Sequence, residues 1–141
     1  MQRYRQRISG PLLDRIDLHI EVPAVEYRDI TSTRPEETSA TIRERVDRAR
    51  ERQRARFQSD KRINCNARMG TRQIKQHCKL SDESQELIRV AMTELNLSAR
   101  AYDRILKVAR TVADLEGSNN IESEHVSEAI QYRTFDRTLW V

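Results

Sequence analysis

One stretch of alternating residues near the N-terminus constrains the fold more than any other feature of the sequence. Over residues 16–22 apolar and polar side chains alternate strictly, in the order Ile-Asp-Leu-His-Ile-Glu-Val, which is the pattern of a half-buried strand. No other stretch has this period, and a strand needs a neighbour to take its backbone hydrogen bonds. We therefore predict a single orphan strand, with the rest of its sheet absent from these 141 residues.

The remainder of the chain has helical periodicity. We expect helices over residues 36–57, 71–77, 82–95, 99–116 and 123–133, after a linker over residues 23–35. The helix over 36–57 would have a narrow apolar seam of Ile42, Val46, Ala49, Gln53 and Phe57, and Tyr102 would lie on the core-facing side of helix 99–116. Ser81 and Ser98 are suited to the N-cap positions of the helices over 82–95 and 99–116, and Gly117 is suited to the C′ position that follows helix 99–116. Only three Gly and three Pro occur, which argues against an all-β fold. The predicted fold class is mainly α, with four or five helices following one strand.

Basic charge is concentrated on the first predicted helix. The whole chain carries a net charge of +4, yet residues 42–62 contain eight Arg and one Lys against four acids, a local net charge of +5. Arg43, Arg50 and Arg54 could form one stripe that contacts DNA phosphates. Acidic residues are interleaved, however, and pairs such as Glu44–Arg48 at i,i+4 spacing are equally natural. From this pattern we favour a solvated, ion-paired helix face over a DNA contact.

Most enzyme signatures are absent from the sequence. It contains no Gly-rich phosphate loop, no GxSxG and no HExxH. Cys65, His77 and Cys78 have donor atoms suited to zinc, but their spacing matches no usual ligand set, so we expect no metal site. There is no apolar run near 18 residues and no secretory signal, and two cysteines form no disulfide framework. We expect a cytoplasmic protein that does not bind a membrane.

Two arginines are candidates for a phosphate site. Arg15 lies where a Pro-Leu-Leu turn enters the predicted strand, and a fixed guanidinium there could act as an arginine finger in phosphoryl transfer. Pairing with Asp14 or Asp17 is the alternative that the local sequence favours. Arg100 falls in the first turn of the predicted helix 99–116, where a cation opposes the helix dipole unless an anion binds there. A solvated Arg100 near Asp103 has about equal weight.

Three motifs resemble one protein family. RISGPLLDRIDLHIEVP at residues 7–23 and LSARAYDRILKVARTVADL at residues 97–115 closely resemble the C-terminal region of bacterial magnesium-chelatase-like AAA+ ATPases, the ComM/YifB family. The segment 121–133, which ends in EAIQYR, is similar to the close of that region. The resemblance covers roughly residues 4–137.

The resemblance implies a domain organisation and a role for both arginines. Residues 1–30 would be the C-terminal remnant of an AAA+ core, and residues 31–141 the helical lid domain. Arg15 matches the arginine finger that acts in trans on a neighbouring subunit's ATP, and Arg100 matches the sensor-2 arginine that contacts ATP in cis. Walker A and Walker B segments have no counterpart in these residues. We therefore expect this chain to be inactive by itself and to hold no bound cofactor.

The resemblance also implies a function for the full-length protein. It would be an ATPase that uses ATP and Mg²⁺ in a homo-oligomeric ring, a hexamer, and acts as a DNA helicase or branch-migration factor in competence. The alternatives are a stand-alone basic helical DNA-binding module, the ATPase subunit of a metal chelatase, and a protein–protein adaptor whose strand pairs with a partner's sheet edge.

Overall fold

A computed structural model describes residues 12, 15–20, 22–27, 31, 36–60 and 62–134. Within them, five α-helices and one 3₁₀ turn follow one another along the chain. They are α4 (Ser39–Arg56), η1 (Asn66–Arg68), α5 (Thr71–His77), α6 (Asp82–Glu94), α7 (Ala99–Glu116) and α8 (Ser123–Thr134). The mainly α fold predicted from the sequence is confirmed, and the described residues contain no strand.

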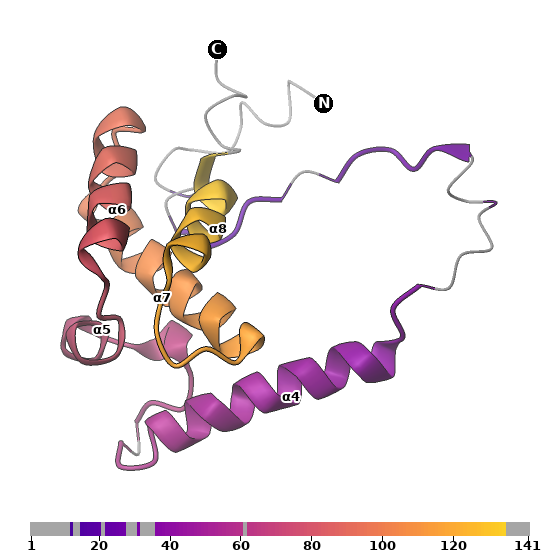
Figure 1. Cartoon of the computed structure of the whole chain (residues 1–141), viewed down its shortest axis with the longest axis horizontal. Helices are drawn as coiled ribbons and strands as arrows, with labels where there is room; N and C mark the ends of the chain where they lie inside the picture. The colour runs from indigo at the N-terminus through magenta and orange to yellow at the C-terminus, as the bar shows by residue number, and fades with distance from the viewer. Residues whose placement is uncertain are drawn as a thin grey trace.

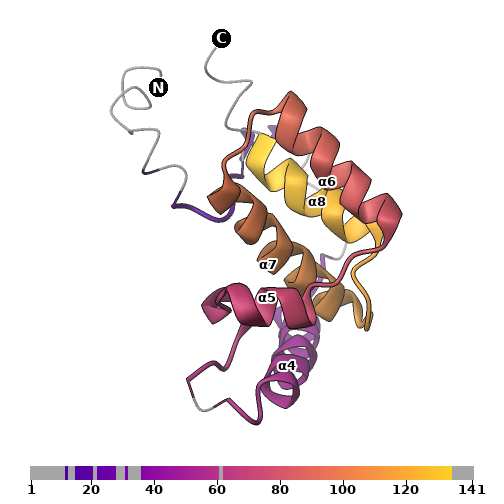
Figure 2. The ribbon, with the colours of Figure 1, turned by 90° about the vertical axis from the view of Figure 1, so that its left-hand side faces the viewer.

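Helix α7 is the centre of the bundle. It packs against α4, η1 and α5 on one side and against α8 on another, while α6 packs against α8 (Figures 1 and 2). Its residues Ile105, Ala109 and Ala113 have no exposed surface, because the apolar side chains recur at helical spacing on one broad face. A parallel bridge between Leu80 and Ile121 ties the segment before α6 to the segment before α8.

Local signals set the ends of α6 and α7 as predicted. The hydroxyl oxygens of Ser81 and Ser98 each accept a hydrogen bond from the backbone N–H three residues later, at 3.2 Å, as N-caps do. Gly117 has a φ of +89°, and the N–H of Ser118 donates to the carbonyl of Ala113 at 2.8 Å. This is a Schellman ending, and it stops α7 at Glu116.

Helix α4 differs from the prediction at its start and along its apolar face. It begins at Ser39 rather than at residue 36, because the Thr38 hydroxyl accepts from the N–H of Thr41 at 3.2 Å and so takes the N-cap position. Ala49 is buried, but Ile42 and Val46 of the predicted apolar seam are each 41% exposed. The N-terminal half of α4 projects past α7, which leaves these two residues uncovered (Figure 1).

The predicted strand is not formed by the residues of this segment that the structure describes. Residues 16–20 and 22 have no ladder partner among the described residues, so alternation alone could not produce a strand. The segment lies on α8 instead. The N–H of His19 donates to the carbonyl of Tyr132 at 3.0 Å, and Arg133 Nη1 donates to the carbonyl of Ile16 at 2.5 Å. Glu21 lies outside the described residues.

Tyr102 was predicted to face the core and is 38% exposed. It lies in the first turn of α7, where it lines a groove together with Ile88 and Met92 of α6. No helix among the described residues is long and apolar enough to cross a membrane. The division of the chain into residues 1–30 and 31–141 stays a prediction.

Candidate phosphate site and basic helix

The turn between α6 and α7 fixes the backbone at Arg100. Asn96 has a φ of +44°, and the N–H of Leu97 donates to the carbonyl of Met92 at 3.0 Å, so α6 also ends in a Schellman motif. Leu97 packs against the core. Ser98 then caps α7 directly, and Arg100 is the second residue of that helix. Its position is therefore held from both sides.

The Arg100 side chain is exposed and makes no hydrogen bond or ion pair with any described residue. Asp103, its alternative partner, does not pair with it. A cation in the first helical turn costs about 0.3–1 kcal/mol against the helix dipole. The same position presents a guanidinium beside free backbone N–H groups, which is a suitable arrangement for binding an anion.

The Arg15 side chain is also exposed. Its backbone N–H closes a turn on the carbonyl of Leu12 at 3.0 Å. Asp17, one of the two predicted partners of Arg15, pairs instead with Arg104 of α7, and the other, Asp14, lies outside the described residues. Arg104 is one helical turn from Arg100. The structure thus brings the segment that carries Arg15 against the helix that carries Arg100.

A buried polar cluster joins α4 to α7, and sequence reasoning missed it. The Asp114 carboxylate accepts from Arg56 at 2.5 and 2.7 Å and from Asn66 at 2.8 Å, and it lies 3.2 Å from Arg110. Gln53, expected in the apolar seam, is buried here and accepts from the N–H of Asn66 at 3.0 Å. A signal was present in the sequence: Arg110 and Asp114 stand four residues apart beside the apolar face of α7, where two charges require pairing.

The environment of this cluster perturbs three titratable groups. Burial lowers the pKa of Arg110, and the charge of Asp114 opposes that effect. Burial raises the pKa of the Cys78 thiol to about 11. Burial, followed by repulsion from Arg56 and Arg110, lowers the pKa of His77. Cys78 is therefore a thiol and His77 a neutral imidazole at neutral pH.

The described residues give no support for a metal site at Cys65, His77 and Cys78. Cys65 and Cys78 are both free cysteines. Among the described residues, no three His, Cys, Asp or Glu side chains converge as a metal site would require.

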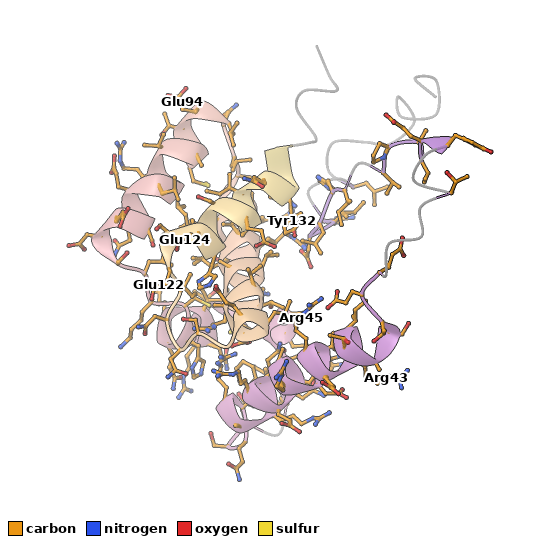
Figure 3. The ribbon with its side chains drawn as sticks, turned by 45° about the vertical axis from the view of Figure 1, so that its right-hand side comes forward. Arg43, Arg45, Glu94, Glu122, Glu124 and Tyr132 are labelled. Atoms are coloured by element: carbon orange, nitrogen blue, oxygen red, sulfur yellow. The ribbon has the colours of Figure 1, made fainter. Side chains whose placement is uncertain are left out.

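The arginines of α4 divide into two groups. Those turned toward the rest of the chain have partners: Arg45 binds Glu37 at 2.7 Å, Arg52 binds Asn119 at 3.2 Å, and Arg56 binds Asp114. Arg48 is exposed and makes no ion pair with the described residues. The same holds for Arg43, Arg50 and Arg54. The 100° step of an α-helix places these three within about 40° of one another. Figure 3 shows Arg43 at the projecting end of α4.

The favoured interpretation of this helix face was therefore wrong in one respect. The expected Glu44–Arg48 pair is not formed among the described residues. The acids interleaved along α4 do not pair with Arg43, Arg50 or Arg54 either. Exposed i,i+4 pairs are worth only a few tenths of a kcal/mol, too little to hold two long side chains together.

Two family models match the chain in consecutive parts. The model described as "Magnesium chelatase, subunit ChlI C-terminal" matches residues 36–133, and "Magnesium chelatase, subunit ChlI" matches residues 1–30. The chain belongs to the magnesium-chelatase-like ComM/YifB family. Arg15 falls within the shorter of the two matches and Arg100 within the longer.

Curated relatives agree with this membership of the ComM/YifB family. The chain is 42% identical to Competence protein ComM of Haemophilus influenzae over 140 residues, which are 99% of this chain and 26% of that protein. It is 43% identical to the uncharacterized protein YifB of Escherichia coli over 138 residues, 97% of this chain and again 26% of the relative. An uncharacterized Mycobacterium tuberculosis protein is 31% identical over 132 residues, 94% of this chain and 26% of its own length. The chain thus spans about a quarter of the relatives it matches.

Proposed function

We propose that this chain is the helical lid of a ring-forming AAA+ ATPase of the ComM/YifB family, in which it couples ATP binding and hydrolysis to motion. The observation that supports this most is the state of Arg100. Its backbone is fixed in the first turn of the central helix, its guanidinium is exposed and unpaired among the described residues, and an anionic ligand would offset the cost of a cation at that position.

In this proposal Arg100 acts in cis as the sensor of the terminal phosphate. The guanidinium and the N-terminal N–H groups of α7 fit the phosphate end of a nucleotide chemically. A pull on Arg100 would move α7, and the Asp114 cluster and the α7–α8 packing would carry α4 and α8 with it as one body.

Arg15 is proposed to act in trans, as the finger that stabilises negative charge on the transferred phosphoryl group of a neighbouring subunit. The cofactors would be ATP and Mg²⁺, in the cytoplasm. The described residues supply no carboxylate cluster for Mg²⁺, so its ligands would come from other parts of the full-length protein.

The test is turnover in a protein of the length of the relatives. Arg15→Ala should lower kcat for ATP hydrolysis by about 10³-fold or more, because it removes the arginine finger. Arg100→Ala should also lower kcat. The fold should persist in both variants. Arg100→Ala should even stabilise the fold by up to about 1 kcal/mol, because a cation leaves the helix N-terminus. Arg72→Ala is the matched control, since Arg72 is exposed and is likewise the second residue of its helix, α5. Undiminished ATPase activity in either variant would refute the assignment.

DNA is the proposed substrate of the ring, as a helicase or branch-migration factor. One relative, ComM, is named a competence protein. That name supports a role of the full-length protein in DNA uptake over a role in metal insertion. Branched DNA should stimulate ATP hydrolysis by the full-length protein. Stimulation of ATP hydrolysis by a porphyrin that accepts a metal ion, in place of DNA, would favour the metal-chelatase alternative.

A second candidate function for the chain itself is a stand-alone DNA-binding module, which the unpaired state of Arg43, Arg50 and Arg54 favours. Three phosphate contacts would give a slope of about −2.7 in a plot of log affinity against log salt concentration. Tight binding of duplex DNA by this chain with that slope would support the module. Weak or absent binding would support the lid.

A further inference from the structure

The projecting half of α4 presents a helix face without a partner in the described part of the chain. Ile42 and Val46 are each 41% exposed, although their counterpart further along the helix, Ala49, is buried. The unpaired arginines Arg43, Arg50 and Arg54 lie on the adjacent face, which continues from the projecting half into the C-terminal half of α4, and the exposed Asp47 lies on the same face. Exposed apolar side chains bordered by mainly basic, unpaired charges are typical of a surface that another macromolecule covers.

A groove of complementary character lies between α6 and α8. It has a volume of about 710 Å³. The acidic residues that line this groove are Glu83 on α6 and Glu124 and Glu128 on α8, and no Lys or Arg lines it. Leu87 and Tyr132 supply apolar surface, and the Tyr132 hydroxyl donates to Glu128 at 2.7 Å. Glu83 and Glu124 have no partner among the described residues.

The two surfaces match in charge and in spacing. Arg50 and Arg54 are one helical turn apart on α4, and so are Glu124 and Glu128 on α8. The axial separation is about 6 Å in both cases. Glu83 on the opposite wall of the groove faces the same space and can receive the third arginine, Arg43. Leu87 offers Val46 an apolar contact.

We propose that the outer face of α4, from Arg43 in its projecting half to Arg54 near its C-terminal end, docks into the α6–α8 groove of a second copy of this chain. The two surfaces lie at opposite ends of the molecule (Figures 1 and 2), and Figure 3 labels Arg43 on α4 with Glu124 and Tyr132 on α8. A copy therefore uses α4 toward one neighbour and the groove toward the other. Such a heterologous contact closes into a ring or extends as a filament. The inference rests on the ring of the proposed function and names the lid surfaces that would join its subunits.

The test measures association of this chain in low salt without nucleotide, by sedimentation velocity over a concentration series. One variant reverses the charge of the α4 stripe, and a second reverses that of the groove. The two variants are R43E/R50E/R54E and E83R/E124R/E128R. Three lost ion pairs at an exposed interface should weaken association by about tenfold to a hundredfold in each variant alone. An equimolar mixture should recover association, because each variant then meets an oppositely charged face.

The matched control reverses three other exposed arginines, in the variant R62E/R68E/R72E. It changes the net charge by the same amount as the α4 variant and should associate like the wild type. Circular dichroism on every variant confirms helicity.

Four results would overturn the inference. They are a wild type that stays monomeric at millimolar concentration, equal weakening in the control, no recovery in the mixture, and an α4 variant that loses DNA binding while its association is unchanged. The last result assigns the stripe to DNA. Because no nucleotide is present, this test can fail while loss of ATPase activity in the Arg100 variant still supports the proposed function, and the reverse also holds.

Discussion

Replacing Asp114 with alanine should be among the most destabilising changes available in this chain. Its carboxylate has no exposed surface, and the side chain of Arg110 beside it is only 3% exposed. Alanine leaves the buried Arg110 guanidinium without a counter-charge and removes one of the two acceptors of the Asn66 amide, the other being Thr111. Arg56, with a side chain 15% exposed, can turn partly toward water.

The expected loss in the free energy of unfolding follows from the burial of Asp114 and Arg110. Breaking a buried pair by removing one partner costs about 3–5 kcal/mol, against a total stability of about 5–15 kcal/mol for a domain. With an m value of about 2 kcal/mol/M, the urea midpoint should fall by about 2 M. Asp114→Asn keeps the shape and removes the charge, so most of the loss should appear there too.

Equilibrium urea unfolding followed by circular dichroism is the appropriate assay. Glu86→Ala is the control, because it removes an exposed ion pair with Arg89 and should leave the midpoint unchanged. An Asp114→Ala midpoint equal to that of the control would refute the reasoning. If Asp114→Asn left the urea midpoint unchanged, packing and not charge would hold the cluster together.

Other perturbations test the helix ends and the buried thiol. Ser98→Ala should cost about 1 kcal/mol by removing the cap of α7, and an unchanged urea midpoint would contradict the cap. Gly117→Ala should cost about 1–2 kcal/mol through its φ of +89°, although the new Cβ would lie 3.6 Å from Arg52 and so meets no clash; a stabilised variant would show that the backbone relaxes. The folded pKa of Cys78, about 11, lies above its ordinary value of 9.0. The unfolded chain therefore releases this proton first, and stability should fall from pH 9 to 11 more steeply in the wild type than in Cys78→Ala. Parallel pH curves would contradict this.

The sequence by itself determined the helices whose ends depend on local chemistry. Ser81, Ser98 and Gly117 set the bounds of α6 and α7 because caps and Schellman turns involve residues within one turn of each other. The family and the positions of Arg15 and Arg100 were likewise visible in contiguous motifs. What the sequence could not supply was the pairing of Asp17, which binds Arg104, far along the chain, and not Arg15.

Only the tertiary structure decided features that depend on distant partners. The residues over 16–22 alternate as a strand would, but a ladder requires a second strand, and the described residues contain none. The apolar seam of α4 is half covered because α7 ends before reaching Ile42 and Val46. Asp114 joins α4 to α7 because folding brings Arg56 and Asn66, from two other segments, to one buried carboxylate. Each outcome follows from contact between residues remote in sequence, which periodicity and capping rules do not encode.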